Sequence, residues 1–475
     1  MRITEIAFFA LFAGVPKLRI PGIYGASAGK PVRYRIPATG ARPIRFAVEN
    51  LPTGLTLDSE RGIITGSVAE KGEYSLQITA SNAEGSDSAA LMLLIGEDCV
   101  LQTPLMGWCS WNAWLYTVND EKIREAADLL VKTGLADCGY GYINLDSSWQ
   151  GAYGGKYDAI MPNERFPDMK GMYDHIHSHG LKGGIYSTPF LNAWGLPESK
   201  PGLPGCTRGE PDPNYPPHNG GIGIDHREEA NAMQWAEWGV DYLKYDWSPC
   251  EPVNAGKMKE GLLKTDRDFG YCCTVHAQPK FADYWAKTCT SWRHCPDSKG
   301  DWATVKQLFE AGRFWHDKMK CGHFCDLDML EIGQMMHSDC TLTEDEIIFS
   351  FSTRAFFNSP IQISCRLDAL TDFEMAVLTN DEIIAINQNV YHPGAIAVEE
   401  IMDGETQLTG IYRKPLSSDS EAVALFNLSD ETKKLTYTSA RVVNIRDAWA
   451  KRDLGKADEV KFEMAPHTVR IVTLK

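Results

Sequence analysis

The sequence predicts a multidomain protein in which a central (β/α)8 barrel is flanked by an N-terminal immunoglobulin-like β-sandwich and a C-terminal antiparallel β-sandwich. Three observations predict this fold class. The chain has 475 residues, which is too long for a single hydrophobic core. Turn-rich segments of alternating polarity lie towards both ends, and the middle alternates strand-like runs with helical patterns. We divide the chain into residues 1–25, a leader or first strand; 26–98, the first sandwich; 99–390, the barrel; and 391–475, the second sandwich.

The first 25 residues leave two interpretations open. Ile6 to Val15 form an apolar run that suits the core of a signal peptide and is too short to span a bilayer. Glu5 interrupts the segment and no small-residue cleavage site follows, so a first strand of the next domain is the alternative. The signal-peptide interpretation predicts a secreted or periplasmic protein, and the strand interpretation also permits a cytoplasmic one. No other segment is apolar for long enough to predict a membrane span.

Residues 26–98 contain short alternating runs such as "YSLQITASN" and "AALMLLIG", separated by Gly, Pro and Asn turns. Strands of this length and spacing are typical of a small β-sandwich. The segment carries no residue pattern that indicates chemistry. We therefore expect it to act in spacing or packing.

Strand-like runs recur between residues 103 and 390, with helical patterns between several of them. Helical patterns such as "HREEANAMQWAEWG" end at Gly, as helix stops do. The eight runs are "LMGWCSW", "YGYINLDSSW", "LKGGIYSTP", "VDYLKYDW", "FGYCCTVH", "TSWRHCPD", "GHFCDLDML" and "SPIQISCRL". Eight such units fit a (β/α)8 barrel. A doubly wound open sheet is the alternative, but no glycine-rich phosphate loop follows the first strand.

Two further segments complete the organisation. Residues 190–225 are rich in Pro and Gly and leave the C-terminal end of the third strand, so we expect a long structureless loop that forms a wall of the pocket. After residue 391 the pattern becomes alternating again, in runs such as "EAVALFNLS" and "HTVRIVTLK". These runs predict the antiparallel C-terminal sandwich.

Composition excludes some functions. The net charge of −16 argues against nucleic acid or another phosphate-rich partner. The 13 cysteines are scattered, and none forms a CxxC pair. Cys321 and Cys325 flank His323, but no second cluster accompanies them, so we expect no metal site there.

The strongest functional signal is the set of residues at the predicted C-terminal strand ends, which converge on one pocket in a barrel. They are Trp111, Asp146, Tyr186, Lys244, Asp246, His276, Arg293, Asp297, Asp326 and Asp328. An acidic pocket with aromatic walls suits a neutral polyol, and two carboxylates on different strands supply the pair that glycoside hydrolysis needs. One such aspartate alone is more often a helix cap. Their recurrence at successive strand ends is harder to explain by capping.

Several of these segments resemble the motifs of glycoside hydrolase family 27, the family of α-galactosidases and α-N-acetylgalactosaminidases. They are "TPLMGWCSWNAW", "YINLDSSW", "GLKGGIYS", "GVDYLKYDW", "SWRHCPD", "GHFCDLDMLEIG" and "LTEDEIIFSFSTRAFFNSPIQIS". The resemblance covers about residues 103–475, while "LPTGLTLDSERGIITGSV" resembles immunoglobulin-like modules found beside bacterial carbohydrate enzymes. It implies a (β/α)8 barrel, a retaining mechanism, and no metal or cofactor.

The resemblance also implies roles for single residues. Asp246 of "YLKYD" corresponds to the nucleophile, and Asp297, four residues after Arg293, to the acid/base. Sugar contacts are implied for Trp111, Asp146, Tyr186 and Arg293. We expect Lys244 to keep Asp246 ionised while it bonds a sugar hydroxyl, and burial with neighbouring carboxylates to favour protonated Asp297.

The chain departs from the family pattern where the family recognises its sugar. Ser147 stands where a second acid usually follows Asp146, and the fifth strand lacks an acid, so His276 or Thr274 is expected to substitute. Asp328 is a candidate to compensate for the acid lost at Ser147. A family cysteine two residues after the nucleophile is replaced by Ser248, and we expect the displaced Cys250 to pair with Cys206.

These observations predict a retaining exo-glycosidase that releases a terminal galactose-like sugar from an oligosaccharide or polysaccharide. A β-L-arabinopyranosidase or an α-N-acetylgalactosaminidase is the alternative within the family, because arabinopyranose is galactose without its C6 arm. A catalytically dead carbohydrate-binding protein is the alternative from another class. The presence of both Asp246 and Asp297 in their motifs argues against it.

Overall fold

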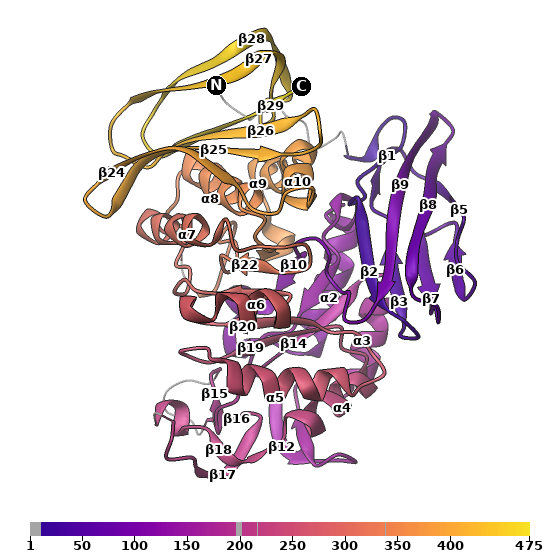
Figure 1. Cartoon of the computed structure of the whole chain (residues 1–475). Coiled ribbons are helices and arrows are strands. Elements are labelled where there is room, and N and C mark those ends of the chain that lie inside the picture. Colours follow the sequence, from indigo (N-terminus) through magenta and orange to yellow (C-terminus); the bar gives the residue numbers. More distant parts are fainter. Residues whose placement is uncertain (1–10, 196–201, 216, 338) are drawn as a thin grey trace.

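The computed structural model describes residues 11–195, 202–215, 217–337 and 339–475. Figure 1 shows a central barrel with a β-domain at its side and a second β-domain above it. Half of the apolar segment from Ile6 to Val15 lies outside the described residues, and Leu11 is buried in the barrel's hydrophobic core. Within the described residues, no helix combines the length and apolar character needed to cross a membrane.

The N-terminal domain is the predicted sandwich of two sheets. One sheet has the order β2 (Ile23–Ser27), β9 (Gly85–Gly96), β8 (Gly72–Asn82) and β5 (Arg45–Glu49), and the other has the order β3 (Val32–Arg35), β7 (Ile63–Gly66) and β6 (Leu55–Asp58). A short pair, β1 (Lys17–Leu18) with β4 (Ala38–Thr39), lies at its edge. Alternate residues of β8, such as Leu76 and Ile78, point into the core between the sheets.

The barrel sheet contains the eight predicted strands, all paired in parallel. The strands are β10 (Met106–Cys109), β11 (Tyr142–Asn144), β14 (Lys182–Ser187), β19 (Tyr242–Asp246), β20 (Gly270–Thr274), β21 (Ser291–Arg293), β22 (Phe324–Asp326) and β23 (Ile361–Ile363). Strand β10 pairs with both β11 and β23, and a parallel bridge from Leu330 to Ile363 joins the other edge. The ring is therefore closed, and the open-sheet alternative is wrong.

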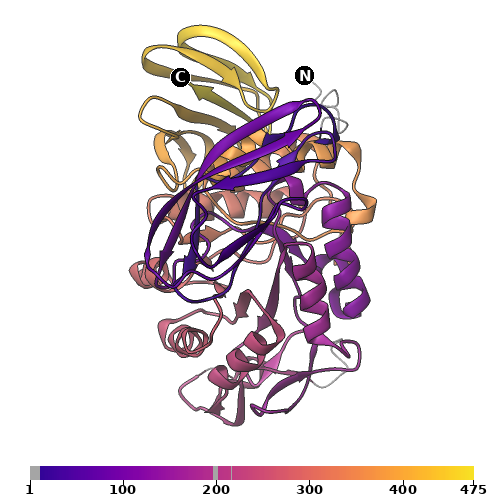
Figure 2. The ribbon, with the colours of Figure 1, turned by 90° about the vertical axis from the view of Figure 1, so that its right-hand side faces the viewer.

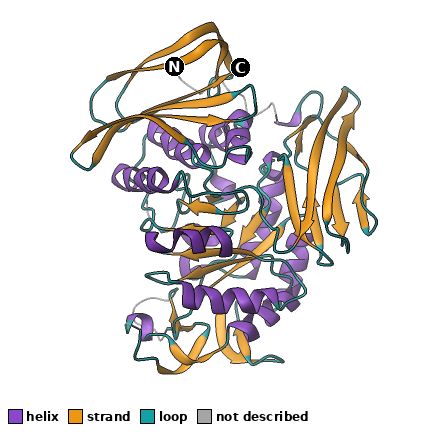
Figure 3. Ribbon diagram, in the orientation of Figure 1, coloured by secondary structure: helices purple, strands orange, loops and turns teal. Residues whose placement is uncertain are grey.

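Helices cover the outside of this sheet (Figure 3). The α-helices are α1 (Ser110–Trp114), α2 (Asp120–Lys132), α3 (Met169–Ser178), α4 (Glu228–Trp238), α5 (Pro252–Leu263), α6 (Ala282–Thr288), α7 (Trp302–Trp315), α8 (Glu344–Phe356), α9 (Asp372–Leu378) and α10 (Asp381–Gln388). The 3₁₀ turns are η3 (Leu115–Thr117), η4 (Ala136–Cys138), η5 (His218–Gly220), η6 (Pro279–Phe281) and η7 (Leu367–Ala369). Helix α4 ends at Gly239, whose φ of 97° is the left-handed conformation that glycine adopts without strain.

The long loop after the third strand is not structureless, so that part of the prediction is wrong. Its described residues form two antiparallel pairs, β15 (Asn192–Ala193) with β16 (Leu203–Pro204), and β17 (Thr207–Pro211) with β18 (Gly223–His226). They lie with the hairpin of β12 (Gln150–Gly154) and β13 (Ala159–Pro162) at the lower end of Figure 1. Strand pairs this short could not be predicted from a segment dominated by Pro and Gly, because both residues are unfavourable in strands.

The C-terminal domain is antiparallel, in the order β24 (Ile396–Asp403), β25 (Thr406–Pro415), β26 (Glu421–Asn427), β29 (Thr468–Leu474), β27 (Lys433–Asp447) and β28 (Arg452–Met464). Its own core includes Val423 and Leu435. The opposite side chains of the same strands pack on the barrel helices, where Phe426 contacts Phe309 of α7 and Phe349 of α8 at centroid distances of 4.8 and 5.2 Å. The two sides of β26 thus join the sandwich to the barrel.

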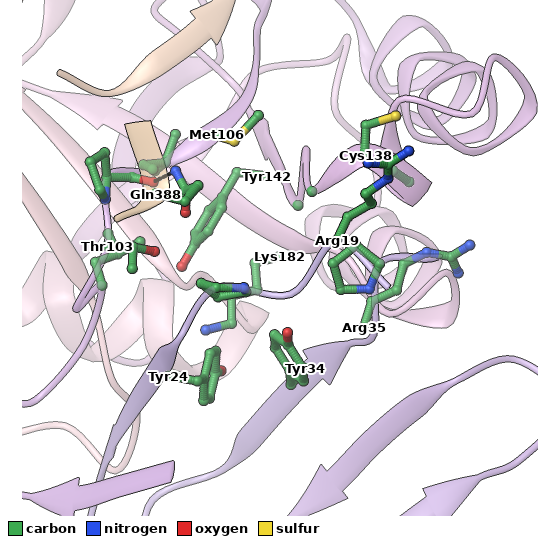
Figure 4. A pocket seen from close by; sticks show the side chains of 18 of the residues that line it. Arg19, Tyr24, Tyr34, Arg35, Thr103, Met106, Cys138, Tyr142, Lys182 and Gln388 are labelled. Atoms are coloured by element: carbon green, nitrogen blue, oxygen red, sulfur yellow. Dashed lines mark hydrogen bonds between the residues drawn. The ribbon is translucent and has the colours of Figure 1, made fainter. Parts of the chain in front are cut away.

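The N-terminal sandwich lies against the flank of the barrel (Figure 2). A cavity between them is lined by residues of both domains (Figure 4). Within it the ammonium of Lys182 lies 5.0 Å from the ring centre of Tyr24 and 5.6 Å from that of Tyr142. Lys182 and Met106 begin their strands, so this cavity is at the N-terminal end of the barrel. It lies between the two domains and is separate from the strand ends described next.

Candidate active site

The C-terminal ends of the barrel strands carry the residues predicted from the sequence, including Asp326 at the end of β22. Trp111 is in α1 directly after β10, Asp146 and Ser147 follow β11, and Tyr186 is in β14. Lys244 and Asp246 end β19, His276 follows β20, Arg293 ends β21 with Asp297 four residues beyond, and Asp328 follows β22. Since parallel strands of a barrel end on one face, the chain brings these side chains to one region from seven strands.

Asp146, which is buried, and Lys244, which is partly buried, form an ion pair. The Nζ of Lys244 donates to Oδ2 of Asp146 at 2.7 Å, and the Cys109 thiol donates to the same oxygen at 3.3 Å. Burial alone would lower the pKa of Lys244, but the Asp146 carboxylate raises it above its ordinary value, with smaller contributions from Cys109 and Asp246. The lysine is therefore held as a cation beside Asp246, although its direct bond goes to Asp146.

Asp246 is the carboxylate at the tip of β19. The phenol of Tyr186 donates to its Oδ2 at 3.1 Å. Burial raises its pKa to about 7, and repulsion from Asp297 and Asp146 acts in the same direction, while Lys244 and Arg293 act to lower it. The expectation that Lys244 keeps Asp246 ionised is thus only partly met, because desolvation outweighs the two cations in the free protein.

Arg293 connects the remaining carboxylates. Its Nη1 lies 2.5 Å from Oδ1 of Asp328, and its Nη2 lies 2.5 Å from Oδ1 of Asp297. Burial would lower the pKa of this guanidinium, but Asp328 and Asp297 raise it well above the ordinary value. Asp328 also accepts from the backbone N–H of Ser298 at 2.8 Å. The arginine therefore fixes the segment that carries Asp297 to the end of β22.

Asp297 differs from its neighbours because it faces solvent. Its side chain is 75% exposed, whereas those of Arg293 and Asp328 are 4% and 5% exposed. The expectation that Asp297 is buried is wrong. The reason is that the strand ends at Arg293, and the next four residues carry Asp297 outwards to the rim of the site. The site therefore combines the buried carboxylates of Asp146 and Asp328 and the partly buried one of Asp246 with the exposed carboxylate of Asp297, which interacts electrostatically with Asp246.

Comparison with known proteins identifies the family. A family model described as "Alpha galactosidase A" matches residues 103–200 and 218–389, one described as "Putative Ig domain" matches 16–96, and one for the "Alpha galactosidase C-terminal beta sandwich domain" matches 406–474. The chain belongs to the α-galactosidase family, glycoside hydrolase family 27. It is an α-galactosidase-like glycosidase with an N-terminal immunoglobulin-like domain.

Relatives of the family resemble most of this chain. "Alpha-galactosidase 3" of Arabidopsis thaliana is 32% identical over 379 residues, which cover 76% of this chain and 79% of that protein. "Alpha-galactosidase A" of Cellvibrio japonicus is 32% identical over 349 residues, 70% of this chain and 77% of that protein. A solved structure of a "putative alpha-galactosidase/melibiase" from Bacteroides fragilis has a TM-score of 0.84 at 28% identity, covering 98% of this chain and 99% of that one. The fold match thus includes all three domains.

The family resemblance makes Ser147 notable, and the structure shows what this serine does. Its hydroxyl donates to the backbone carbonyl of Trp194 in the long loop, and its side chain is almost fully buried. Gly195 lies so close that an added Cβ would be 2.7 Å from the Ser147 hydroxyl oxygen and 2.5 Å from that of Ser148. The long loop therefore packs directly on the end of the second strand, the position expected for a pocket wall. Its Trp194 carbonyl accepts the hydrogen bond of the Ser147 hydroxyl.

His276 lies at the edge of the cluster. Its Nδ1 is 2.8 Å from the hydroxyl of Ser248, two residues after Asp246. Burial lowers its pKa, and Arg293 and His294 add to that effect. It lines a surface cavity with residues of α7, such as Phe314. The structure thus places His276 beside the segment that follows the candidate nucleophile, and no contact joins it to Asp146 or Asp246 among the bonds of the described residues.

The expected disulfide between Cys206 and Cys250 is wrong, since all 13 cysteines are free thiols. The sulfur of Cys206 lies 3.0 Å from the hydroxyl of Ser187, and the Cys250 thiol donates to the Trp247 carbonyl at 3.2 Å. Both thiols are satisfied inside the barrel core by local groups. The loop is held by packing and hydrogen bonds instead.

Three contributors were missed by sequence reasoning. Cys109 donates to Asp146, and Trp194 anchors Ser147. Glu331 is 2% exposed, and burial with the charge of Asp328 raises its pKa to about 8. Cys109 ends the first strand and Glu331 lies three residues after Asp328, so their positions in the motifs were the available signals. Trp194 had no such signal, because the path of the loop is not encoded locally.

Proposed function

We propose that the protein is a retaining exo-glycosidase that hydrolyses terminal α-D-galactosides, with Asp246 as nucleophile and Asp297 as acid/base. The observation that carries the proposal is the arrangement around Arg293: its guanidinium pairs with the exposed Asp297 after β21 and acts electrostatically on the partly buried Asp246 at the end of β19. Retaining hydrolysis needs two carboxyl groups in different environments. The family to which the chain belongs supports the galactoside.

In the first step, Asp297 donates a proton to the leaving oxygen while Asp246 attacks the anomeric carbon, which yields a glycosyl–enzyme ester and the free aglycone. Tyr186 donates to Oδ2 of Asp246 and orients the carboxylate for this attack. The exposed position of Asp297 allows the aglycone to leave from the solvent side.

In the second step, Asp297 takes a proton from water, the hydroxyl attacks the anomeric carbon, and the ester to Asp246 breaks. The sugar is released with its original anomeric configuration. The cations of Lys244 and Arg293 stabilise the carboxylate that departs. Asp146 and Lys244, already paired, present an acceptor and a donor to sugar hydroxyls, and the partly exposed Trp111 offers an indole face to sugar C–H groups.

A panel of nitrophenyl glycosides tests this proposal. We expect turnover of the α-galactoside, and proton NMR of the first product is expected to show α-galactose. An inverted product would exclude the retaining mechanism, and the absence of turnover on every glycoside of the panel, with binding of free sugar retained, would favour the carbohydrate-binding alternative.

The raised pKa of Asp246 predicts a pH dependence. A carboxyl group attacks only when ionised, so kcat/KM is expected to rise with pH through about 7, the pKa of Asp246 in the free protein. Below that pH, kcat/KM falls because protonation of Asp246 removes the nucleophile. Lys244→Met removes a cation that lowers this pKa, so the midpoint of the rise is expected to move to higher pH. A pH–rate profile on a nitrophenyl substrate measures both.

Lys182→Met provides the matched control. Lys182 is also a lysine in a barrel strand, but it begins β14 and lies at the opposite end of the barrel, in the cavity of Figure 4. Its replacement is expected to leave the midpoint unchanged. Equal midpoints for Lys244→Met and the parent protein would show that Lys244 does not act on Asp246.

A second candidate, β-L-arabinopyranosidase activity, is favoured by one observation. The Ser147 hydroxyl is occupied by the Trp194 carbonyl, so the end of the second strand offers one sugar-binding carboxylate, Asp146. Loss of a charge-assisted hydrogen bond costs about 1.5–3 kcal/mol, or roughly ten- to a hundredfold in kcat/KM. Arabinopyranose lacks the C6 arm of galactose, so the missing acid is expected to lower kcat/KM less for an arabinopyranoside than for a galactoside.

Ser147→Asp is therefore expected to raise kcat/KM on aryl α-galactosides by about tenfold and to leave arabinopyranosides less affected. Ser148→Asp is the matched control, since Ser148 is the next residue and its hydroxyl donates to the Gly195 carbonyl in the same loop. Competition kinetics on the two nitrophenyl sugars measures the ratio. If the parent protein already cleaves α-galactosides efficiently and Ser147→Asp is neutral or harmful, Ser147 does not weaken galactose recognition.

A further inference from the structure

A cluster of potential metal ligands lies on the helices outside the barrel sheet, apart from the candidate active site. It consists of Asp128 of α2, His175 in the last turn of α3, and His179 at the C-terminal cap of α3. The Nε2 atoms of His175 and His179 lie 2.9 and 2.8 Å from the same Oδ1 of Asp128. We propose that these three side chains bind a divalent transition-metal ion of the zinc type.

The local structure brings the two imidazoles together. His175 and His179 are four residues apart, which places them on one face of a helix. The N–H of His179 bonds the Ile176 carbonyl, so the backbone continues the turn to this residue. The ring centres are 5.1 Å apart, and packing of α2 on α3 adds the carboxylate of Asp128. The ligand atoms of all three side chains lie within 4.8 Å of one another.

The N-terminal domain fixes the backbone at this point. Arg33 donates to the carbonyl of His177 at 3.1 Å, and Arg35 donates to that of His179 at 3.1 Å. Arg61 donates to the carbonyl of Ser178 between them. Three arginines from another domain therefore hold the end of α3, so His179 is positioned before any ion arrives. A positioned ligand set loses less conformational entropy on binding.

The geometry suits a tetrahedral ion. Zinc–nitrogen and zinc–oxygen bonds of about 2.0–2.1 Å place neighbouring ligand atoms about 3.3 Å apart. The two nitrogens need to move from Asp128 by about half an ångström and to lie about 3.3 Å from each other, starting from within 4.8 Å. The exposed fractions of 29%, 25% and 55% for His175, His179 and Asp128 leave room for this movement and for a water as fourth ligand. The ring protons then lie on Nδ1, and the Nε2 lone pairs bind the ion.

The chemistry of the donor set selects the class of ion. Two imidazole nitrogens and one carboxylate oxygen suit zinc and its neighbours cobalt, nickel and copper, whereas calcium and magnesium prefer oxygen ligands alone. The bound ion would join α2 to α3 beside the contact with the N-terminal domain. An ion that binds only the folded protein raises its thermal stability.

The test uses the full-length protein without a histidine tag, treated with EDTA and dialysed into a buffer that does not chelate metals. Isothermal titration with zinc chloride is expected to show one ion per chain at this site, and the melting temperature is expected to rise with zinc concentration. Cobalt is expected to give the visible absorption of a tetrahedral site. A crystal soaked in zinc is expected to show an anomalous peak between the three side chains.

Variants separate this site from thiols, since the protein has 13 free cysteines. His175→Gln and His179→Gln are each expected to weaken the zinc affinity at least tenfold and to abolish the tetrahedral cobalt spectrum, with the circular dichroism unchanged. Asp174→Asn is the matched control: Asp174 is on the same helix with a similar exposure of 57% and pairs with Lys170 instead. Equal zinc affinity in the parent protein and the double histidine variant, or no binding in either, would overturn the proposal.

Discussion

Asp246→Ala is expected to lower kcat by about 10⁴-fold or more on nitrophenyl α-galactoside, because it removes the proposed nucleophile and with it the covalent intermediate of the proposed mechanism. The side chain lies in a prepared environment: Tyr186 donates to it, and the cations of Lys244 and Arg293 act on it. The substitution deletes a partly buried carboxyl group whose one hydrogen-bond partner among the described side chains is Tyr186, so the barrel is expected to remain folded. Steady-state kinetics and circular dichroism measure both effects.

Azide distinguishes loss of the nucleophile from a general defect. In Asp246→Ala, a small anion fits the vacated space and attacks the sugar once, so the expected product is a glycosyl azide of inverted configuration. Asp326→Ala is the matched control, because Asp326 is another buried aspartate at the end of a barrel strand and bonds the Cys272 thiol at 3.4 Å. Its loss is expected to lower activity less and to produce no azide adduct. Normal turnover by Asp246→Ala would exclude it as nucleophile.

Asp297→Ala is expected to lower kcat by about 10²–10⁴-fold on substrates whose leaving group needs protonation. The reason is that the proposed mechanism assigns to Asp297 both the proton donated in the first step and the proton removed from water in the second. The dinitrophenolate of a dinitrophenyl glycoside leaves without a proton from Asp297. The first step is therefore expected to be nearly unaffected on this substrate, and the covalent intermediate is expected to accumulate. Pre-steady-state kinetics is expected to show this as a burst of dinitrophenol.

Azide again gives a specific result. In Asp297→Ala it replaces the water of the second step, so the expected product is a glycosyl azide of retained configuration, opposite to that from Asp246→Ala. Asp301→Ala is a control from the same segment, since Asp301 caps α7 by accepting from the N–H of Thr304. It is expected to reduce stability by about 1 kcal/mol without azide rescue. If Asp297→Ala keeps full activity on all leaving groups, the acid/base is another residue.

Much of the fold was predictable because it rests on local patterns. The strand runs and the glycines that end helices, such as Gly239, recur with the period of a barrel, and the eight strands occur as predicted. The loop at residues 190–225 was predicted as structureless and instead forms short antiparallel pairs. Short strand pairs depend on where distant segments meet in the folded chain. The periodicity of the sequence does not predict those meeting points.

The sequence by itself determined which polar residues lie at the C-terminal strand ends, because the position of Asp246 or Arg293 after a buried run fixes the end of the barrel at which it lies. Only the tertiary structure decided the partners. Lys244 bonds Asp146, and Ser147 bonds the loop at Trp194. Asp297 reaches solvent, while Cys206 and Cys250 remain thiols. The physical reason is range: strand direction follows from neighbouring residues, whereas hydrogen bonds, burial and the pKa of a carboxyl group depend on ångström-scale distances between segments far apart in the chain.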